Sequence, residues 1–267
     1  MVWVFAAGVP RAVWRTVVQR RMGGCVPHPR PVTCKKFDNY PHGDFHLRMR
    51  CLLVIPALNE EPTIARVIEA AKGHIPDILV VDDGSEDGTA AAATHANVVV
   101  TRHDVNKGKG EALKTAFAYA GEHDYDWVFT IDGDAQHDPQ DLKGFFPLLD
   151  RYDLLLGNRM EDAQRIPFIR RVANRLSSAI VSVLCGRRIH DSQTGFRAYK
   201  MELIRAISLR THRYELESEI LIKASRKGFR IGHCRIQTIY AGERSRFRNF
   251  GDSMKFLAMA LRSVFWW

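Results

Sequence analysis

The segment Trp127-Val128-Phe129-Thr130-Ile131-Asp132-Gly133-Asp134-Ala135-Gln136 is a short apolar run followed by two aspartates that flank a glycine. A run of this length, rich in β-branched and aromatic residues, predicts a buried strand of a parallel sheet. A strand that leaves the sheet through a tight glycine turn can aim Asp132 and Asp134 at one point. Two carboxylates that close need a cation between them, and oxygen ligands favour Mg²⁺ or Mn²⁺ over zinc.

Gln136 lies two residues further on and can add a neutral oxygen to the same site. The segment therefore predicts a divalent metal held by Asp132, Asp134 and Gln136. For an isolated Asp-x-Asp the alternative is an ordinary turn with solvated acids. The position of these acids directly after a hydrophobic run favours the metal site.

The chain on both sides of this segment alternates apolar runs with amphipathic helical patterns, as in a parallel sheet covered on both faces. Strands are predicted over residues 52–56, 78–82, 98–101, 127–132, 154–157, 195–199 and 230–240. Helices are predicted over residues 61–71, 89–95, 110–121, 140–151, 168–184 and 253–267, with one more that ends near residue 228. The expected fold class is α/β, a Rossmann-like and mostly parallel sheet flanked by helices in a single domain.

Polar segments follow the first four predicted strands, and ligands of open α/β sheets bind outside these carboxyl ends. The segments are Pro56-Ala57-Leu58-Asn59-Glu60-Glu61, Asp82-Asp83-Gly84-Ser85, residues 102–110, and Asp132 to Gln136.

Residues 83–94 do not complete a calcium-binding loop, because Thr94 stands where a bidentate glutamate is needed. Gly108-Lys109-Gly110 lacks the Ser/Thr of a P-loop, so Lys107 or Lys109 either approaches a phosphate or simply opens the following helix.

The excess positive charge lies mainly at the N-terminus. Residues 1–50 hold nine Lys/Arg against two acids, a net charge of +7, whereas the remaining 217 residues hold 30 basic and 28 acidic groups, a net charge of +2. The body is nearly neutral, which does not indicate a nucleic-acid groove. We interpret residues 1–48 as a poorly ordered basic extension, 49–252 as the folded domain, and 253–267 as an amphipathic, aromatic helix.

Five scattered cysteines and the lack of an obvious secretory signal predict reduced thiols in a cytosolic compartment. The cysteines and histidines between residues 25 and 46 match no trusted zinc pattern.

No run of about 18 apolar residues occurs, so a spanning helix is not predicted and any membrane contact is peripheral. The apolar residues of the C-terminal helix either lie on a membrane surface or pack onto the domain as core.

Several of these segments, taken in order, resemble a known family. They are Pro56 to Glu61, Val81 to Thr89, Asn106 to Gly110 and Asp132 to His137, and they resemble family 2 glycosyltransferases of the GT-A fold. Three later segments narrow the resemblance to relatives of dolichyl-phosphate mannosyltransferase and of bacterial polyprenyl-phosphate glycosyltransferases. These are Gly157-Asn158-Arg159, Asp191-Ser192-Gln193-Thr194-Gly195-Phe196-Arg197 and Tyr214-Glu215-Leu216-Glu217-Ser218-Glu219.

The resemblance implies roles for individual residues. The implied catalytic residues are Asp134, Arg159 and Asp191, and the metal ligands are Asp132, Asp134 and Gln136. The implied donor-binding residues are Pro56, Ala57, Asn59, Glu60, Asp82, Asp83, Lys109 and Asp132. The implied ligands of an acceptor phosphate are Arg159, Gln193, Arg197 and one of Arg171 and Arg175, which lie four residues apart on one helix face. Residues 244–250 resemble a loop that covers the donor.

The implied reaction is inverting transfer of a sugar from a GDP-, UDP- or dTDP-sugar to a polyprenyl (dolichyl or undecaprenyl) phosphate, with Mg²⁺ or Mn²⁺. We expect a protein at the cytoplasmic face of a membrane, attached peripherally, with no nucleic-acid partner. One alternative is a hydroxyl acceptor on a glycan or small molecule, with Asp191, Glu217 or Glu219 as the base. Another is a nucleotide-sugar-binding partner protein without catalysis, against which the intact metal ligands and Arg159 argue.

Overall fold

The structure is a computed structural model that describes residues 49–160, 168–237, 239, 260 and 263. The N-terminal extension predicted at 1–48 and the donor loop predicted at 244–250 lie outside the described residues. Only Ala260 and Ser263 of the helix predicted at 253–267 are described. The boundaries drawn at residues 48 and 252 therefore stay predictions.

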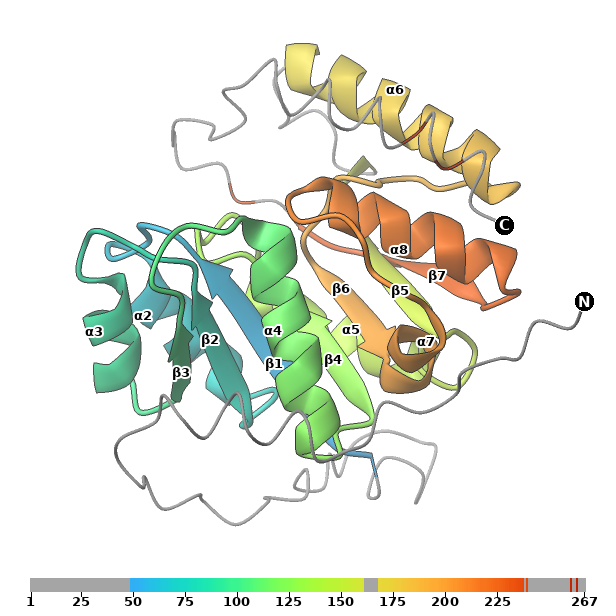
Figure 1. Cartoon of the computed structure of the whole chain (residues 1–267). Coiled ribbons are helices and arrows are strands. Elements are labelled where there is room, and N and C mark those ends of the chain that lie inside the picture. The colour runs from blue at the N-terminus through green and yellow to red at the C-terminus, as the bar shows by residue number, and fades with distance from the viewer. Residues whose placement is uncertain (1–48, 161–167, 238, 240–259, 261–262, 264–267) are drawn as a thin grey trace, which may run out of the picture. The chain divides into compact units, whose positions relative to one another are not determined.

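The described strands form one sheet in the order β3-β2-β1-β4-β6-β5-β7 (Figure 1). Neighbouring strands run parallel, except that β6 is antiparallel to both β4 and β5. The predicted mostly parallel sheet is thus confirmed. The bounds are β1 Cys51–Ala57, β2 Ile78–Asp82, β3 Val99–Arg102, β4 Trp127–Thr130, β5 Leu154–Asn158, β6 Arg197–Lys200 and β7 Ile231–Arg235.

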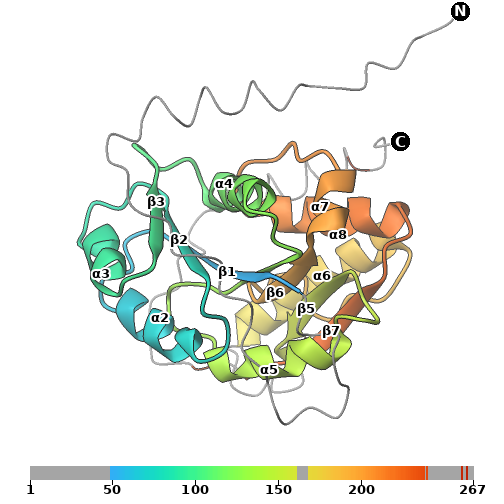
Figure 2. The same cartoon turned by 90° about the horizontal axis from the view of Figure 1, so that it is seen from below.

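Helices cover both faces of this sheet. In Figure 2, α4, α7 and α8 lie over one face, and α2 and α5 lie over the other. The bounds are α2 Ile64–Lys72, α3 Thr89–His95, α4 Lys109–Glu122, α5 Leu142–Phe145, α6 Phe168–Cys185, α7 Met201–Ala206 and α8 Glu215–Arg226. Two short 3-10 helices, η1 Pro139–Asp141 and η2 Phe146–Leu148, flank α5.

Alternate residues of the central strand β1 point to opposite faces of the sheet. Leu52 and Val54 belong to the core under α4 and α8, whereas Leu53 and Ile55 belong to the core under α2 and α5. A strand buried on both faces needs apolar residues at every position, which explains the unbroken apolar run.

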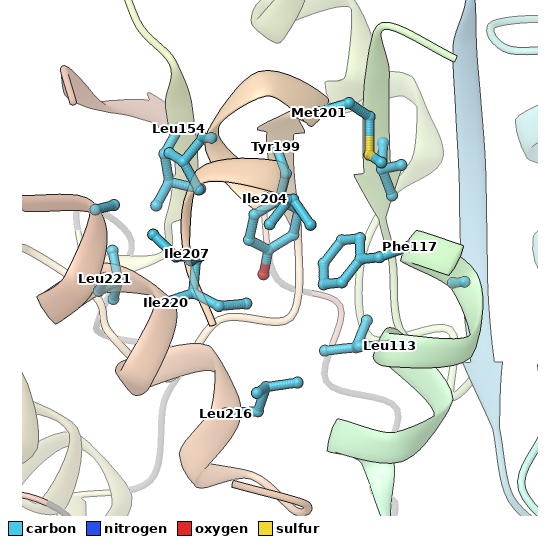
Figure 3. Packing of buried hydrophobic residues seen from close by; sticks show 14 of the residues in the cluster. Leu113, Phe117, Leu154, Tyr199, Met201, Ile204, Ile207, Leu216, Ile220 and Leu221 are labelled. Atoms are coloured by element: carbon cyan, nitrogen blue, oxygen red, sulfur yellow. The ribbon is translucent and has the colours of Figure 1, made fainter. Parts of the chain in front are cut away.

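The core under α4 fixes where that helix begins. Phe117 of α4 packs edge to face on Tyr199 of β6, with ring centroids 5.3 Å apart. Ile204 and Ile220 surround this pair in the same cluster (Figure 3). Because α4 is anchored along its length, its first residue, Lys109, is held at the carboxyl edge of the sheet.

Close backbone contacts bring the loops at this edge together. Gly84 has φ 78°, and a methyl group there would lie 2.6 Å from the carbonyl carbon of Val105. Only glycine therefore fits between the loops that follow β2 and β3. A methyl group on Gly110 would similarly lie 2.5 Å from the carbonyl carbon of His212, so the loop before α8 crosses the first turn of α4.

Four expectations about individual elements were wrong or incomplete. The helix expected at 140–151 is instead η1, α5 and η2, because Pro147 cannot continue an α-helical hydrogen-bond ladder. The strand expected at 230–240 ends at Arg235, and the strand expected at 195–199 begins only at Arg197. Helix α7 was not expected, since six residues are too few to show a helical period.

Cys51, Cys185 and Cys234 are buried, and none of these three described cysteines is in a disulfide. Within residues 49–160 and 168–237, we find no helix that combines the length and the apolar character needed to cross a bilayer.

The buried carboxylate of Glu219, on α8, holds the loop that crosses α4. It accepts hydrogen bonds from the backbone N–H groups of Arg210 and Thr211, from the Thr211 hydroxyl, and from the Lys223 ammonium. Burial opposes its ionisation, yet these donors hold the pKa of Glu219 below its usual value. Its contribution to stability is therefore present above the pKa of an unfolded glutamate, about 4.3, and is lost as the pH falls through the lower folded-state pKa.

We predict that Glu219→Gln destabilises the fold at neutral pH by about 2–4 kcal/mol, because Lys223 loses its buried partner. The difference from wild type should shrink as the pH falls below about 4, when the wild-type carboxylate also becomes protonated. Urea unfolding at a series of pH values measures both effects. Glu69→Gln removes an exposed glutamate paired with Lys72 and should change stability by less than about 0.5 kcal/mol. A pH-independent difference would contradict this account.

Candidate active site

The two acids that follow β4, Asp132 and Asp134, lie in a tight turn beside the first residue of α4, Lys109. The Asp134 carboxylate accepts a hydrogen bond from the Gln136 backbone N–H at 3.0 Å, and Ala135 between them has φ 56°. The Lys109 ammonium donates to Asp132 Oδ1 at 2.7 Å, and His137 Nε2 lies 3.8 Å from Asp132 Oδ2. The structure therefore places all three predicted metal ligands within one turn.

Lys109 lies between two acids. Its Nζ is also 3.4 Å from Glu217 Oε1 of α8, an oxygen that is buried and has no hydrogen-bond partner among the described residues. Burial opposes the charge on Lys109, but Asp132 and Glu217 raise its pKa. Burial likewise opposes the charge on Asp132, but Lys109 lowers its pKa. Both groups are charged at neutral pH, and each fixes the orientation of the other.

The pKa of Asp134 is raised by burial and by the negative charge of Asp132. A cation between the two carboxylates would relieve this repulsion. No cluster of three His, Cys, Asp or Glu side chains able to hold a metal occurs in the described part of the chain. Two carboxylates with open positions suit Mg²⁺, which usually completes its shell with water and substrate phosphates. The oxygen atoms that Asp132, Asp134 and Gln136 can offer to a metal fit Mg²⁺ or Mn²⁺.

The loop that follows β1 contacts the same turn. The Thr63 hydroxyl donates to the Gly133 carbonyl oxygen at 2.7 Å, and a methyl group on Gly133 would lie 3.3 Å from Glu60 Cγ. Asn59 joins this loop to the one after β2, because its Oδ1 accepts the Glu86 N–H and its N–H donates to Ser85 Oγ. The predicted convergence of strand ends is thus observed for the first, second and fourth strands, and Lys109, in the segment after the third strand, also contacts Asp132.

Asp82 and Asp83, which were predicted to bind the donor nucleotide, are buried and hydrogen-bonded within the protein. Asp82 Oδ1 accepts the Ser85 N–H. Asp83 Oδ1 accepts the Lys107 N–H and lies 2.7 Å from His103 Nδ1, while its Oδ2 accepts the Gly108 N–H. Both aspartates hold the loops that frame the site, and whether either also contacts a nucleotide stays a prediction.

On the other side of β4, Arg159 and Asp191 form a bidentate pair. Arg159 Nε and Nη2 donate to the two carboxylate oxygens at 2.6 and 3.0 Å, and the Gln193 N–H donates to Asp191 Oδ1 at 3.1 Å. Burial opposes the charge of Asp191, yet Arg159 lowers its pKa. The predicted acceptor residues Arg159, Asp191 and Gln193 are therefore adjacent.

Arg197 does not fit the acceptor role predicted for it. Its side chain has no exposed surface, and its N–H groups donate to the carbonyl oxygens of Thr194, Glu217 and Ser192. A guanidinium with its donors occupied in the core cannot meet a phosphate. Arg197 instead ties the segment before β6 to α8.

Arg171 and Arg175 both lie on α6. Arg175 is exposed and lines a hollow that also contains Asn158 and Met160, the chain neighbours of Arg159. This placement favours Arg175 over Arg171, which is half-buried, as the second acceptor arginine.

A protein-family model described as "Glycosyl transferase family 2" matches residues 52–208, more than half of the chain. The chain belongs to glycosyltransferase family 2. It is similar to the UDP-N-acetylglucosamine–dolichyl-phosphate N-acetylglucosaminyltransferase of Methanococcus voltae, with 34% identity over 213 residues, 70% of this chain and 85% of the relative. It is also similar to the undecaprenyl-phosphate mannosyltransferase of Micrococcus luteus, with 29% identity over 196 residues, 68% of this chain and 81% of the relative.

Among solved structures, this family 2 glycosyltransferase is similar to glucosyl-3-phosphoglycerate synthase of Mycobacterium tuberculosis in complex with Mn²⁺, UDP-glucose and phosphoglyceric acid. The TM-score is 0.68 at 24% identity, over 81% of this chain and 80% of the other. This likeness confirms the predicted GT-A fold.

Sequence reasoning missed three contacts of this family 2 site. It treated Glu217 as a candidate base or a solvated helix residue and did not anticipate its pairing with Lys109, because 108 residues separate them in the chain. It gave no role to His137, which is buried beside Asp132, or to His103, which contacts Asp83. Each histidine lies within or next to a motif, and that position was the one available signal.

We predict that Gly195→Ala impairs catalysis without unfolding the protein. A methyl group on Gly195 would lie 2.3 Å from Asp132 Oδ2, so the carboxylate must shift. A displacement of this size typically lowers kcat/KM about 100-fold. Steady-state kinetics and thermal unfolding measure the two effects separately. Gly73→Ala is the matched control, since nothing lies within 4 Å of that position. If Gly195→Ala left the kinetics unchanged, the observed position of the Asp132 carboxylate would not be required for catalysis.

We predict that Arg197→Lys lowers stability by about 3–5 kcal/mol, because three buried carbonyl oxygens lose a planar set of donors that lysine cannot replace. Arg205→Lys, at an exposed position on α7, should be nearly neutral. Chemical denaturation provides the measurement. If Arg197→Lys instead raised the KM for the acceptor at unchanged stability, the acceptor role would be restored.

Proposed function

We propose that this glycosyltransferase transfers a sugar, with inversion, from a nucleotide-sugar to the phosphate of a polyprenyl lipid, and that it requires Mg²⁺ or Mn²⁺. Two relatives support the acceptor class, since one is a dolichyl-phosphate and the other an undecaprenyl-phosphate sugar transferase. The solved relative crystallised with Mn²⁺ and a UDP-sugar supports the donor class and the metal.

One observation carries the choice of a phosphate acceptor. Each acid considered as a base for a hydroxyl acceptor is already paired: Asp191 with Arg159, Glu217 with Lys109, and Glu219 with Lys223. A hydroxyl needs a free base to remove its proton. A phosphate monoester, with a second pKa of about 6, is already largely anionic at neutral pH and needs little such help. The paired acids therefore favour a phosphate.

On the donor side, we assign the residues around the β1 and β2 loops to the nucleotide. Pro56 and Ala57 end β1, Asn59 and Glu60 lie in the loop after it, and Asp82 and Asp83 accept hydrogen bonds from the loops that follow β2 and β3. Lys109 lies beside the metal acid Asp132 and is placed to attract the donor's diphosphate. These roles rest on the family resemblance and on the convergence of the loops.

We assign Asp132, Asp134 and Gln136 to the metal, which when bound would neutralise charge on the departing nucleoside diphosphate. The protein's own groups then have three tasks. Lys109 holds Asp132 in place, and Arg159, itself held by Asp191, offers a guanidinium edge to the acceptor phosphate. Gly195 leaves room for the Asp132 carboxylate. Attack from the side opposite the diphosphate would invert the anomeric configuration.

We predict that Asp134→Ala lowers turnover about 1000-fold, because the metal loses one of its two carboxylates. The assay supplies GDP-, UDP- or dTDP-sugars with Mn²⁺ and a short-chain polyprenyl phosphate. It measures released nucleoside diphosphate and the mass of the lipid product, and NMR of the product gives its anomeric configuration. Asp138→Asn changes a neighbouring acid that caps η1 and should keep near wild-type turnover.

The outcomes separate the alternatives. A sugar found on a hydroxyl group, with none on the lipid phosphate, would contradict the proposed acceptor. Donor binding without release of nucleoside diphosphate under all conditions would indicate a binding protein without catalysis. Full turnover in the presence of a strong chelator would contradict the metal requirement.

A further inference from the structure

A lysine binds one of the carboxylate groups that is assigned to the metal. The Lys109 ammonium donates to Asp132 Oδ1 at 2.7 Å, and the two side chains are only 15 and 28% exposed. A divalent ion bound by Asp132 would therefore lie close to a fixed positive charge. Like charges that are close repel each other, most strongly where water is largely excluded. Lys109 and a metal thus compete for the negative charge of Asp132.

The surroundings of Asp132 keep its carboxylate from turning away from this lysine. Asp132 Oδ2 lies 3.8 Å from His137 Nε2. The backbone at Gly195 lies against both oxygens, since a methyl group there would be 2.4 Å from Oδ1 and 2.3 Å from Oδ2. The carboxylate is therefore confined by Lys109, His137 and Gly195, and rotation of Asp132 does not remove the competition.

Glu217, on α8, offers the ammonium a second acceptor. Its Oε1 lies 3.4 Å from Lys109 Nζ, is buried, and accepts no hydrogen bond from the described residues. Glu217 is itself held in place, because its backbone carbonyl oxygen accepts from Arg197 Nη1 and its Oε1 lies 3.7 Å from Arg197 Nε. A buried carboxylate oxygen without a hydrogen bond is costly, so a shift of Lys109 toward Glu217 would be favourable for that oxygen.

Lysine is well suited to being shared between two acids. Its ammonium carries three N–H donors on a flexible four-carbon stem, so it can move between acceptors without losing every contact. The contact with Asp132 is a hydrogen bond, whereas the contact with Glu217 is an ion pair without one. The positive charge of Lys109 can therefore be divided between the two acids in different proportions.

We propose that Glu217 is a positioning residue that sets the metal affinity of Asp132 through Lys109. By drawing the ammonium toward itself, Glu217 leaves more of the negative charge of Asp132 for a divalent ion. Without Glu217, the charge of Lys109 would fall on Asp132 alone. The inference rests on the metal site of the proposed function, and it adds a determinant of metal affinity that lies outside the three assigned metal ligands.

The test measures Mn²⁺ binding to the full chain by electron paramagnetic resonance, without donor or acceptor, so that the readout does not depend on turnover. Lys109→Met should bind Mn²⁺ about tenfold more tightly than wild type, because the competing charge is gone. Glu217→Gln should bind Mn²⁺ about tenfold more weakly, because Lys109 then stays on Asp132.

The double variant shows whether Glu217 acts through Lys109. If it does, adding Glu217→Gln to Lys109→Met should change the Mn²⁺ affinity by less than about twofold, so that the two effects are not additive. The double variant removes both members of a buried ion pair, and it keeps the test decisive if Lys109→Met alone lowers the melting temperature. It should bind Mn²⁺ more tightly than wild type.

Two control variants remove the same kinds of charge from the same helices. Lys114→Met changes a lysine of α4 that is paired with Glu111, and Glu215→Gln changes an acid of α8 two residues before Glu217. Residues two apart on a helix point to different faces. Both controls should bind Mn²⁺ within about twofold of wild type, because their charges do not compete at Asp132.

Two results would overturn the inference. One is Mn²⁺ binding by the double variant that is no tighter than in wild type, which would mean that Lys109 only orients Asp132. The other is an equal effect of Glu217→Gln with and without Lys109, which would mean that Glu217 acts on the metal directly.

Asp134→Ala separates this inference from the proposed function. If Asp134→Ala abolishes Mn²⁺ binding while the effects at Lys109 and Glu217 are additive, the inference fails and the metal site stands. If Asp134→Ala binds Mn²⁺ like wild type, the assigned metal site is wrong and the inference fails with it.

Discussion

The ammonium group of Lys109, held between Asp132 and Glu217, is the contact on which the geometry of the site depends. The three residues come from the first turn of α4, the end of β4 and the start of α8. A partly buried ion that loses its partner costs several kcal/mol, so these three elements cannot shift independently. The packing of Phe117 on Tyr199 and the buried Arg197 serve the same end, because each joins one of these elements to β6 or to the segment before it.

This arrangement prepares the site electrically before any ligand arrives. Asp132 is kept charged and oriented by Lys109, while Asp134 experiences the charge of Asp132 and burial, without a comparable cation beside it. The negative charges of the two acids are therefore neutralised to different extents, and the carboxylate of Asp134 is the less neutralised of the two. Across β4, the Arg159–Asp191 pair places a positive guanidinium whose orientation is set by two hydrogen bonds to its acid.

The sequence allowed the sheet, most of its strands and the cluster of polar strand ends to be predicted, because a buried parallel strand and a glycine turn both leave strong local patterns. Asp132 and Asp134 were identified for that reason. The assignments that failed depend on distant partners: nothing near Arg197 in the chain indicates that its donors are used by Thr194, Ser192 and Glu217. The pairing of Glu217 with Lys109 likewise becomes visible only when the neighbours of α8 in the fold are known.

Because β6 runs in the reverse direction, the two walls of the site are formed by separate stretches of the chain. Because β6 is antiparallel to β4, its amino end lies beside the carboxyl end of β4, where the Thr130 hydroxyl donates to the Gly195 carbonyl oxygen at 2.7 Å. The wall built from the loops after β1 and β2 and the wall that carries Asp191 thus belong to separate stretches of chain that meet along one seam. Under the proposed function, replacing the stretch from Arg159 to Gly195 with that of another family member would change the wall assigned to the acceptor and leave in place the wall assigned to the nucleotide.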